Sequence, residues 1–439
     1  MRFLGVTETC DLGALYLSLL HEGHEVKISV SEPLARGTMA GLVEHAPDWR
    51  AELDWVRAAG EDGVILFEAV SEGFGALQDD LRREGFNVIG GSAYGDRLEN
   101  DRAFAQEVLA EIGFPRGHVW EFEEADEALA FIAANPARYV LKYSGPDHAS
   151  QNNYLGQLSD GRDVAAVLKS RGAHTAETSR FILMRFIEGV EMAAGAYFNG
   201  ERFITPACLD WEHKRFFAGD LGELTGEMGT VVTFDRTGAF FRRTLLPLEG
   251  RLREHGHVGW VNLNTIVNED GVWPLEFTCR FGYPGFAVLA PLQLTPWGEL
   301  FAAVARRAPQ VMRTRPGFSV GVVLTTPPFP YTRKQVSEPV GLPIMLDEDA
   351  DPAHLHLGEA GLDESGQLCT AGLYGWTAVA TGVGATIQDA QRAAYRQIGS
   401  LLIPNVRYRL DIGDRLIAAD WARLETLDLL DPPESGGVP

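Results

Sequence analysis

Buried-strand patterns and amphipathic helix patterns alternate along the first hundred residues. Short apolar runs predict strands at 2–6, 25–30, 63–67 and 86–90. Amphipathic spacing predicts helices between them, including Ala14–His21 and Phe74–Arg83. Strands that alternate with helices build parallel βαβ units. We therefore expect a doubly wound parallel sheet over 1–97. The turn after the first strand reads GVTETCDLGA, which lacks the GxGxxG pattern of a dinucleotide site.

The rest of the chain mixes helix patterns with longer β-rich stretches. Apolar spacing predicts one helix over Leu98–Ile112, with Gly113 and Pro115 as its stop signal. Further strands are expected at 139–142, 180–189 and 191–206, and a connector at 300–316. A capping-box-like sequence at Thr386–Asp389 predicts a helix that runs to about Leu402. The C-terminal part, 313–428, is thus expected to be an α+β domain, and 429–439 a flexible tail.

Composition narrows the class of protein. Hydrophobic residues make up 45% of the 439 positions and charged residues 23%, which is typical of a globular protein. The formal net charge of −23 argues against a nucleic-acid partner, because such binding needs lysine and arginine on phosphates. The four cysteines form no CxxC pair, which indicates a reduced protein without a zinc motif. We see no secretory signal and no membrane-spanning run, so the expected location is the cytoplasm.

The segment PLEFTCRFGYPG, Pro274–Gly285, carries the strongest chemical signal. Period-2 alternation on a strand places Glu276, Thr278 and Arg280 on one face. A carboxylate suits a hard metal ion such as Mg²⁺, and a guanidinium suits phosphoryl oxygens. A half-buried Glu276–Arg280 salt bridge explains the same pattern equally well.

Two segments before it could contact a nucleotide. Lys142 closes a predicted strand beside the polar loop SGPDHASQNNYLG, and a lysine there can reach phosphates. Its ordinary alternative is a solvated surface lysine. In Phe186–Glu191, backbone groups could bind an adenine edge and Glu191 could hold ribose hydroxyls. A hairpin turn with two exposed acids is the alternative there.

Two further segments contain polar side chains that could bind an anion or a metal. Lys214 and Arg215 form a basic pair before a loop with four glycines, whose backbone can approach an anion closely. A long surface loop is the alternative. Asn262 and Asn264 lie on a predicted strand one hairpin before Glu276. Either amide oxygen could complete a metal shell, and polarity of an edge strand is the alternative.

The order of these segments resembles one family. GGSAYGDRLENDRAFAQEVLAEIGFP, EHKRFFAGDLGELTGEMG, LEFTCRFGYPG, GLYGWTAVATGVGATIQDAQRAAY and RYRLDIG are similar, in this order, to segments of phosphoribosylamine–glycine ligase (glycinamide ribonucleotide synthetase). The resemblance covers about 60–420. Several collinear matches are far more specific than any single motif.

The resemblance implies an ATP-grasp fold of α/β and α+β parts, with an N-terminal doubly wound parallel-sheet domain and a C-terminal β-rich domain. The ATP-grasp region would span 98–312, with a small lobe over about 118–183 and a central lobe over about 184–312, holding the nucleotide between them. The implied reaction joins a carboxylate and an amine through an acyl phosphate, with ATP and Mg²⁺ or Mn²⁺, in purine biosynthesis. Its partners are small molecules, and the protein is expected to be a monomer or a dimer.

The resemblance also implies roles for individual residues. Arg280 and Lys214 would be catalytic, and Glu276, Thr278 and Asn264 would hold metal. The nucleotide would contact Arg102, Lys142, Arg185, Ile187 and Glu191. The substrate loop would contain Gly226, Glu227, Met228 and Gly229.

Several positions depart from the family pattern. Where the family has a glycine-rich turn with an Arg-Glu-His run for the phosphoribosyl group, this chain has TETCDLGAL. Glu8 and Asp11 there would repel a sugar phosphate. The lysine of the family's phosphate loop is missing from 144–156. The family lysine before the helix near residue 100 is replaced by Arg102. Thr278 replaces a metal-binding asparagine, and Tyr283 replaces an acid.

The matches to the family and the departures from it leave three hypotheses about function. The first is the family reaction on phosphoribosylamine and glycine. The second is the same ATP-grasp chemistry on a different amine and acid pair, outside purine synthesis, which the lost anion-binding turn favours. The third, of another class, is a nucleotide-binding protein that has lost catalysis. The retained Lys142, Glu191, Lys214, Glu276 and Arg280 oppose the third.

Overall fold

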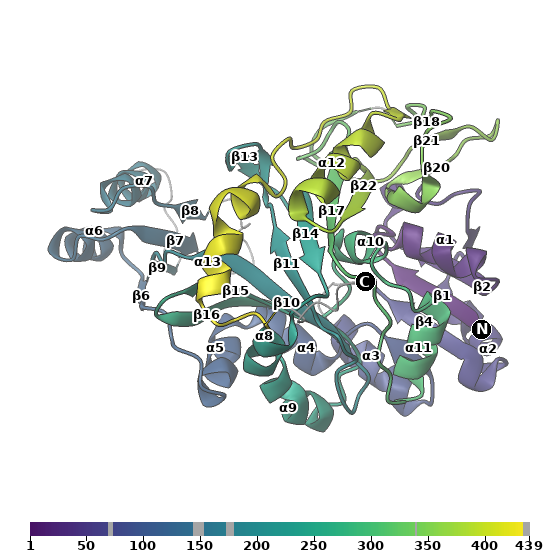
Figure 1. Cartoon of the computed structure of the whole chain (residues 1–439), viewed down its shortest axis with the longest axis horizontal. Coiled ribbons are helices and arrows are strands. Elements are labelled where there is room, and N and C mark those ends of the chain that lie inside the picture. Colours follow the sequence, from purple (N-terminus) through teal and green to yellow (C-terminus); the bar gives the residue numbers. More distant parts are fainter. Residues whose placement is uncertain (69–72, 144–152, 173–179, 339, 433–439) are drawn as a thin grey trace. The chain divides into compact units, whose positions relative to one another are not determined.

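The computed structural model describes residues 1–68, 73–143, 153–172, 180–338 and 340–432. The chain forms two compact units, whose elements are labelled in Figure 1. Unit 1 comprises Met1–Val108, Glu191–Thr265 and Leu275–Pro439, and unit 2 comprises Leu109–Val190 and Ile266–Pro274. Most of the loop 144–156 and of the tail 429–439 lies outside the described residues, so closure of the loop and flexibility of the tail stay predictions. The domain boundaries at 97, 312 and 428 also stay predictions.

Unit 1 begins with a five-stranded parallel sheet. Its order is β3-β2-β1-β4-β5, and every pair in it is parallel. The strands are β1 (Arg2–Thr7), β2 (Glu25–Val30), β3 (Glu44–His45), β4 (Gly63–Phe67) and β5 (Asn87–Ile89). The helices of this part are α1 (Gly13–His21), α2 (Leu53–Arg57) and α3 (Phe74–Arg83). The doubly wound sheet and its helices are therefore confirmed, close to the predicted bounds.

The single helix expected over 98–112 is wrong. The chain forms α4 (Ala93–Asn100) and α5 (Arg102–Glu111), separated at Asp101. Asp101 has extended backbone, with φ −99° and ψ 91°, and its carboxylate accepts the backbone N–H of Phe104 at 3.0 Å. An aspartate at this position caps the start of a helix. The apolar spacing runs through both helices and does not show where α4 ends. The signal for the break between them is the cap at Asp101.

The larger sheet of the protein has eight strands, in the order β16-β15-β10-β11-β14-β17-β22-β19. Their bounds are β10 (Val190–Phe198), β11 (Cys208–Glu212), β14 (Gly229–Thr233), β15 (Gly259–Asn268), β16 (Gly271–Thr278), β17 (Phe318–Thr325), β19 (Leu355–Leu357) and β22 (Trp376–Gly384). Strands from the C-terminal part of the chain thus continue the sheet that starts in its middle. We refer to it as the central sheet.

Smaller elements complete unit 1. Two-stranded sheets pair β12 (Arg215–Phe217) with β13 (Leu221–Leu224), β18 (Met345–Leu346) with β23 (Leu401–Leu402), and β20 (Ala360–Leu362) with β21 (Leu368–Thr370). The remaining helices are α8 (Gly238–Thr244), α9 (Glu249–Glu254), α10 (Gly285–Leu289), α11 (Trp297–Ala305), α12 (Ile387–Ile398) and α13 (Trp421–Thr426). The predicted cap at the start of α12 is present, since the Thr386 hydroxyl accepts the Asp389 N–H at 3.1 Å. Helix α12 ends four residues earlier than expected.

Unit 2 contains a four-stranded antiparallel sheet in the order β6-β9-β7-β8. Its strands are β6 (Val119–Phe122), β7 (Tyr139–Tyr143), β8 (Tyr154–Leu155) and β9 (Phe181–Arg185), and its helices include α6 (Ala125–Ala134) and α7 (Arg162–Gly172). A separate small core of buried apolar side chains, with Tyr139 and Leu141 of β7 at its centre, holds this sheet to its helices.

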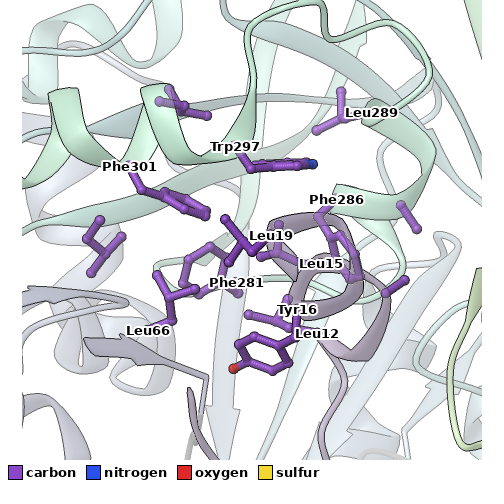
Figure 2. Packing of buried hydrophobic residues seen from close by; sticks show 14 of the residues in the cluster. Leu12, Leu15, Tyr16, Leu19, Leu66, Phe281, Phe286, Leu289, Trp297 and Phe301 are labelled. Atoms are coloured by element: carbon purple, nitrogen blue, oxygen red, sulfur yellow. The ribbon is translucent and has the colours of Figure 1, made fainter. Parts of the chain in front are cut away.

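The largest apolar core of unit 1 fixes the segment that follows β16. Figure 2 shows Phe281 packed among side chains of α1, α10 and α11, including Leu19 and Phe301. The rings of Phe281 and Phe301 lie 6.2 Å apart in an edge-to-face arrangement. Burial of a phenylalanine contributes about 1.5–3 kcal/mol. Arg280, directly before Phe281, and Tyr283, two residues after it, are therefore held on a fixed backbone.

Across the described residues, no helix has both the length and the apolar character needed to cross a membrane.

Candidate active site

Three carboxylates converge on the ammonium group of Lys214. Its Nζ lies 2.9 Å from Glu276 Oε1, 3.2 Å from Glu212 Oε2 and 3.4 Å from Glu191 Oε1. Glu276 comes from β16, Glu191 from β10 and Glu212 from β11, so the central sheet brings together residues up to 85 positions apart. We call these four residues the Lys214 cluster. It joins three residues that the sequence selected with Glu212, which the sequence analysis missed.

The two asparagines of β15 lie inside the sheet, between β16 and β10. Asn264 donates to Glu191 Oε1 at 2.9 Å, and Asn262 donates to Asp210 Oδ2 at 2.8 Å. The explanation by edge-strand polarity is therefore wrong, because β15 has a neighbour on each side. Their spacing of two puts both amides on one face of the strand, where they complete a polar patch on the sheet.

Electrostatics keeps the ammonium of Lys214 charged. Burial opposes its charge, but Glu212, Glu276 and Glu191 outweigh burial and raise its pKa well above the ordinary value. Burial and the charge of Glu212 raise the pKa of the neighbouring Asp210. The patch thus has an excess of acids around one fixed cation. An arrangement of this kind attracts further positive charge.

The oxygen donors of the patch have the chemistry that a hard cation prefers. Within 1–68, 73–143, 153–172, 180–338 and 340–432, however, no group of three or more His, Cys, Asp or Glu side chains is arranged to hold a metal. The ammonium of Lys214 lies at the point where Glu276, Glu212 and Glu191 converge. Thr278, the last residue of β16, is half-buried beyond Glu276.

The alternative explanation of this segment, a salt bridge between Glu276 and Arg280, is wrong. Strand β16 ends at Thr278, so period-2 alternation does not extend to Arg280. The Arg280 guanidinium instead binds Glu99 of α4, with N–O distances of 3.0 and 3.1 Å. Glu99 also accepts the backbone N–H of Cys279 at 2.9 Å, which ties the end of the strand to the helix.

Arg102 lies beside the same strand. Its guanidinium is 3.5 Å from the Leu275 carbonyl oxygen, at the limit of a hydrogen bond. Burial lowers the pKa of Arg102, and the negative charge of Glu276 works in the opposite direction. The structure therefore places Arg102 within electrostatic reach of Glu276. Its contact with a nucleotide stays a prediction.

The glycine-rich segment forms a hairpin followed by a buried turn. Gly219 and Gly222 have φ of +71° and +79°, which the β12–β13 hairpin requires. Gly226 precedes Glu227, which is buried, with no hydrogen-bond partner for its Oε1 among the described residues. Met228 is fully buried, and Gly229 begins β14 with no room for a side chain against the Gly321 carbonyl. Backbone contact with an anion here stays a prediction.

The other predicted nucleotide residues lie in unit 2. Lys142 is half-buried near the end of β7, and Arg185 is exposed at the end of β9. The two strands are adjacent and antiparallel, with Tyr139 opposite Arg185 and Lys142 opposite Ile182. Ile187 lies two residues after the end of β9. The nucleotide roles of these three residues stay predictions.

Acids gather at the carboxyl end of the first sheet. Glu68 directly follows β4 and accepts the Tyr16 hydroxyl and the Leu12 N–H, both at 2.8 Å. Burial, together with the charge of Asp11, raises the pKa of Glu68 to about 8. Sequence analysis noted Asp11 but missed Glu68, although an acid directly after a buried strand is a recognisable signal.

Glu68 predicts a pH dependence of stability. The pKa of Glu68 is 4.5 in the unfolded reference and about 8 in the folded protein. The protonated acid therefore contributes fully to the free energy of unfolding below pH 4.5, and this contribution is lost as the pH rises to about 8. Glu68→Gln imitates the protonated acid at every pH. Its free energy of unfolding should therefore fall by about a few kcal/mol less than that of the wild type between low and high pH. Urea unfolding at about pH 5 and about pH 8 measures it, with exposed Glu61→Gln as control. Equal falls in wild type and Glu68→Gln would contradict the assignment.

Comparisons with known proteins agree with this architecture. The family described as phosphoribosylglycinamide synthetase, ATP-grasp (A) domain, matches residues 100–286. A Vibrio cholerae phosphoribosylamine–glycine ligase is 27% identical over 422 residues, covering 92% of this chain and 91% of that protein. One from Pseudomonas aeruginosa is 28% identical over 354 residues, covering 78% and 80%. The similarity therefore extends well beyond the matched domain.

Solved structures show the same fold. The phosphoribosylamine–glycine ligase of Thermotoga maritima superposes with a TM-score of 0.68 at 21% identity, covering 94% of this chain and 100% of that one. A biotin carboxylase domain from Hydrogenobacter thermophilus, in complex with MgADP and bicarbonate, has a TM-score of 0.60 at 12% identity, covering 98% and 99%. The ATP-grasp fold and the family resemblance predicted from the sequence are both confirmed.

Proposed function

We propose that this divergent relative of the phosphoribosylamine–glycine ligases, an ATP-grasp ligase by fold, joins a carboxylate to an amine at the expense of ATP. The observation that carries the proposal is the Lys214 cluster. The ammonium of Lys214 stays charged and lies among several carboxylates on one sheet. This arrangement suits a reaction in which the negative charge of a phosphoryl group must be positioned and neutralised. Relatives named for this ligation match over most of their length.

The proposed reaction has two steps. A carboxylate oxygen of the acid attacks the γ-phosphorus of ATP, and the bond to ADP breaks. The amine nitrogen then attacks the acyl carbon, phosphate leaves with its bonding oxygen, and the nitrogen gives up one proton. Lys214 would neutralise the transferring phosphoryl group, and Arg102 would assist it. Exclusion of water would protect the acyl phosphate from hydrolysis.

Mg²⁺ is part of the proposal because the oxygen donors present have the chemistry that it prefers, although no three acidic side chains of the described residues are arranged around a metal position. Glu276 and Glu212 would hold the ion, with the amide oxygen of Asn264 as a further donor, because carboxylate and amide oxygens are its preferred ligands. When bound, the ion neutralises charge on the triphosphate. The MgADP complex of the Hydrogenobacter biotin carboxylase domain supports this choice. Lys214 would release Glu276 and Glu212 when the ion is bound.

The proposal gives unit 2 the task of holding the nucleotide. Lys142 and Arg185 would contact ATP, and backbone groups around Ile187 would bind the adenine edge. Lys142 and Arg185 lie on the adjacent strands β7 and β9, and the register puts their side chains on opposite faces of that sheet. Glu191 would contact the nucleotide from the start of β10. The expected location of such an enzyme is the cytoplasm, where ATP and biosynthetic intermediates are available.

Phosphoribosylamine and glycine form the first substrate pair to test, since the relatives carry that name. Purified protein with Mg²⁺ and ATP should release ADP and phosphate only when a suitable acid and amine are both present. Failure with phosphoribosylamine and success with another amine would establish the alternative, ATP-grasp chemistry on a different pair. A broad screen without ADP release, in a protein that still binds ATP, would refute the ligase and leave a nucleotide-binding protein.

A further inference from the structure

Two bonds from a distant segment hold the chain on either side of Lys214. The Arg409 guanidinium donates to the carbonyl oxygen of Arg215 at 3.1 Å. The backbone N–H of Gly413 donates to Nε2 of His213 at 3.1 Å. The residues directly after and directly before Lys214 are thus bound to groups 194 and 200 positions further along the chain.

Arg409 also binds the tip of the hairpin that follows Lys214. Its side chain is 3% exposed, and its guanidinium contacts both oxygens of Asp411, at 2.5 and 3.1 Å, and Asp220 Oδ1 at 2.8 Å. Asp411 in turn accepts the backbone N–H of Gly219 at 2.8 Å. Gly219 and Asp220 form the turn between β12 and β13, and both have positive φ, +71° and +55°. Only a planar fork with several donors can make all these bonds at once.

The ring of His213 is a neutral acceptor. A backbone N–H can only donate, so the bond from Gly413 requires an unprotonated Nε2. Burial, together with the charge of Arg409, lowers the pKa of His213 to about 4. Near neutral pH the ring therefore carries its proton on Nδ1, and Nε2 ties the residue before Lys214 to the distant segment.

Residues 409–413, which we call the C-terminal support, are anchored on helix α12. The Tyr395 hydroxyl donates to the carbonyl oxygen of Arg409 at 2.9 Å and accepts the N–H of Ile412 at 3.1 Å. The side-chain amide of Gln391 donates to the carbonyl oxygen of Ile412 at 2.9 Å. Helix α12 packs against β17 and β22 of the central sheet. The C-terminal support is therefore fixed to the same sheet that carries the Lys214 cluster.

The position of Lys214 depends on such bonds because the residue lies outside the strands. Strand β11 ends at Glu212, and β12 begins at Arg215. Strands β12 and β13 form a two-stranded sheet of their own, and an isolated hairpin is only marginally stable in water. The carbonyl oxygen of Lys214 accepts the N–H and the hydroxyl of Thr225, both at 2.8 Å, which joins it to the end of this hairpin. A shift of the hairpin would therefore move Lys214 relative to its carboxylate partners.

We infer that Arg409 is a positioning residue for Lys214. Together with His213 it fixes the backbone on both sides of Lys214, so that the ammonium stays where the phosphoryl group is transferred. The catalytic consequence rests on the proposed ligase function, whereas the placement of Lys214 can be tested without any substrate. The segment RYRLDIG, which resembles the family but received no role from the sequence, thereby acts on the reaction through Lys214.

Chemical labelling of lysine tests the placement. An amine-reactive ester acylates only the unprotonated amine, and peptide mass spectrometry gives the rate at each lysine. Arg409→Lys keeps a positive charge but loses the planar fork. Lys214 should then leave its carboxylates, so its pKa should fall and its labelling at about pH 8 should become about tenfold faster. Equal rates at Lys214 in the wild type and in Arg409→Lys would overturn the inference.

Lys27 is the matched control for a general loosening of the fold. It belongs to the same unit, its Nζ lies 2.8 Å from Glu52 Oε2, and its side chain is 19% exposed against 25% for Lys214. Its labelling should not change in Arg409→Lys. An equal acceleration at Lys27 and Lys214 would count against the inference, because it would indicate loss of the fold and not of one position. The variant Arg392→Gln removes an exposed arginine of α12 and should label like the wild type at both lysines.

Two substitutions of His213 separate its acceptor from its size. His213→Gln keeps an acceptor at about the reach of Nε2, whereas His213→Leu fills similar space and leaves the Gly413 N–H without its partner. Labelling of Lys214 should be faster in His213→Leu, and His213→Gln should restore a rate closer to that of the wild type. Equal acceleration in both variants would remove His213 from the inference.

Kinetics of a double substitution test whether Arg409 acts through Lys214. Arg409→Lys should lower kcat for ADP release by about 10²-fold, because a misplacement of about 1 Å at a reaction centre has this effect. The KM for ATP should stay within about twofold of the wild type. In a Lys214→Met background the same substitution should cost less than about twofold, because the group that Arg409 positions is gone. Effects that multiply independently would show a general structural role and overturn the inference.

Failure of the proposed ligase function would look different. No pair of acid and amine would then release ADP, while the labelling of Lys214 would still respond to Arg409→Lys.

Discussion

Replacement of Glu276 by glutamine is expected to reduce substrate-dependent ADP release by about 10³-fold, since loss of one electrostatic contact at a reaction centre costs roughly 10²–10³ and this residue has two roles. Glu276 is the carboxylate nearest to Lys214 Nζ, at 2.9 Å, and the proposal makes it a magnesium ligand. Glutamine keeps the size of the side chain but loses its charge. Steady-state ADP release at several Mg²⁺ concentrations measures the effect.

The fold should survive this change, because Glu276 is exposed on its strand. Exposed substitutions usually change the free energy of unfolding by less than about 0.5 kcal/mol. Exposed Asp270→Asn, in the turn between β15 and β16, provides a control on the same hairpin. Activity of Glu276→Gln within about twofold of the wild type would remove Glu276 from the site.

Lys214→Met is expected to lower turnover by about 10²–10³-fold, as removal of a fixed charge from a preorganised site does. Methionine keeps much of the apolar stem and deletes the ammonium, which leaves Glu276, Glu212 and Glu191 without their common cation. The three carboxylates then repel one another. We expect kcat to fall more than ATP affinity, measured by turnover and by equilibrium ATP binding.

Two further variants separate a catalytic role of Lys214 from a structural one. Lys214→Arg keeps the charge with a different geometry, so it should keep the folded state and recover only part of the activity. Exposed Lys169→Met is the control for loss of a lysine in general. Full activity in Lys214→Met would show that the Lys214 cluster is only an ion-pair network, as structural networks of this kind occur in many proteins.

The Lys214 cluster differs from a preformed metal site in one respect. A lysine ammonium occupies the point where the carboxylates meet, at 2.9–3.4 Å. Competition between an ammonium and Mg²⁺ for the same oxygens would make metal affinity depend on the nucleotide, which brings its own phosphate ligands. Substitution of the family asparagine by Thr278 removes a further amide donor and makes this dependence stronger.

Departures from the family pattern gather around one region of unit 1. The acids of TETCDLGAL follow β1, and Tyr283 follows β16. Although Asp11 and Tyr283 are far apart in sequence, the charge of Asp11 is, after burial, one cause of the raised pKa of Tyr283. The ring of Tyr283, which replaces an acid of the family pattern, lies 5.0 Å from the ring of Trp376.

Local sequence pattern was sufficient for much of the fold. Apolar runs of four to six residues placed β1, β2 and β4, because a buried strand of a parallel sheet is apolar on both faces. Thr386 and Asp389 marked the start of α12, because a capping box satisfies backbone donors within a few residues. Asp101 shows the limit of this approach. Its capping role was present in the sequence, but the continuous apolar spacing of α4 and α5 concealed the break.

The sequence by itself determined the parallel sheet, the ATP-grasp resemblance and the residue types at Lys214 and Glu276. Only the tertiary structure decided their partners. Strand order brings Glu212 and Glu191 to Lys214, because residues on neighbouring strands meet whatever their distance along the chain. The contact of helix α4 with the segment after β16 gives Arg280 to Glu99. The same long-range packing brings the rings of Tyr283 and Trp376 within 5.0 Å of each other. Local periodicity carries no information about which strands become neighbours, so these contacts could not be read from it.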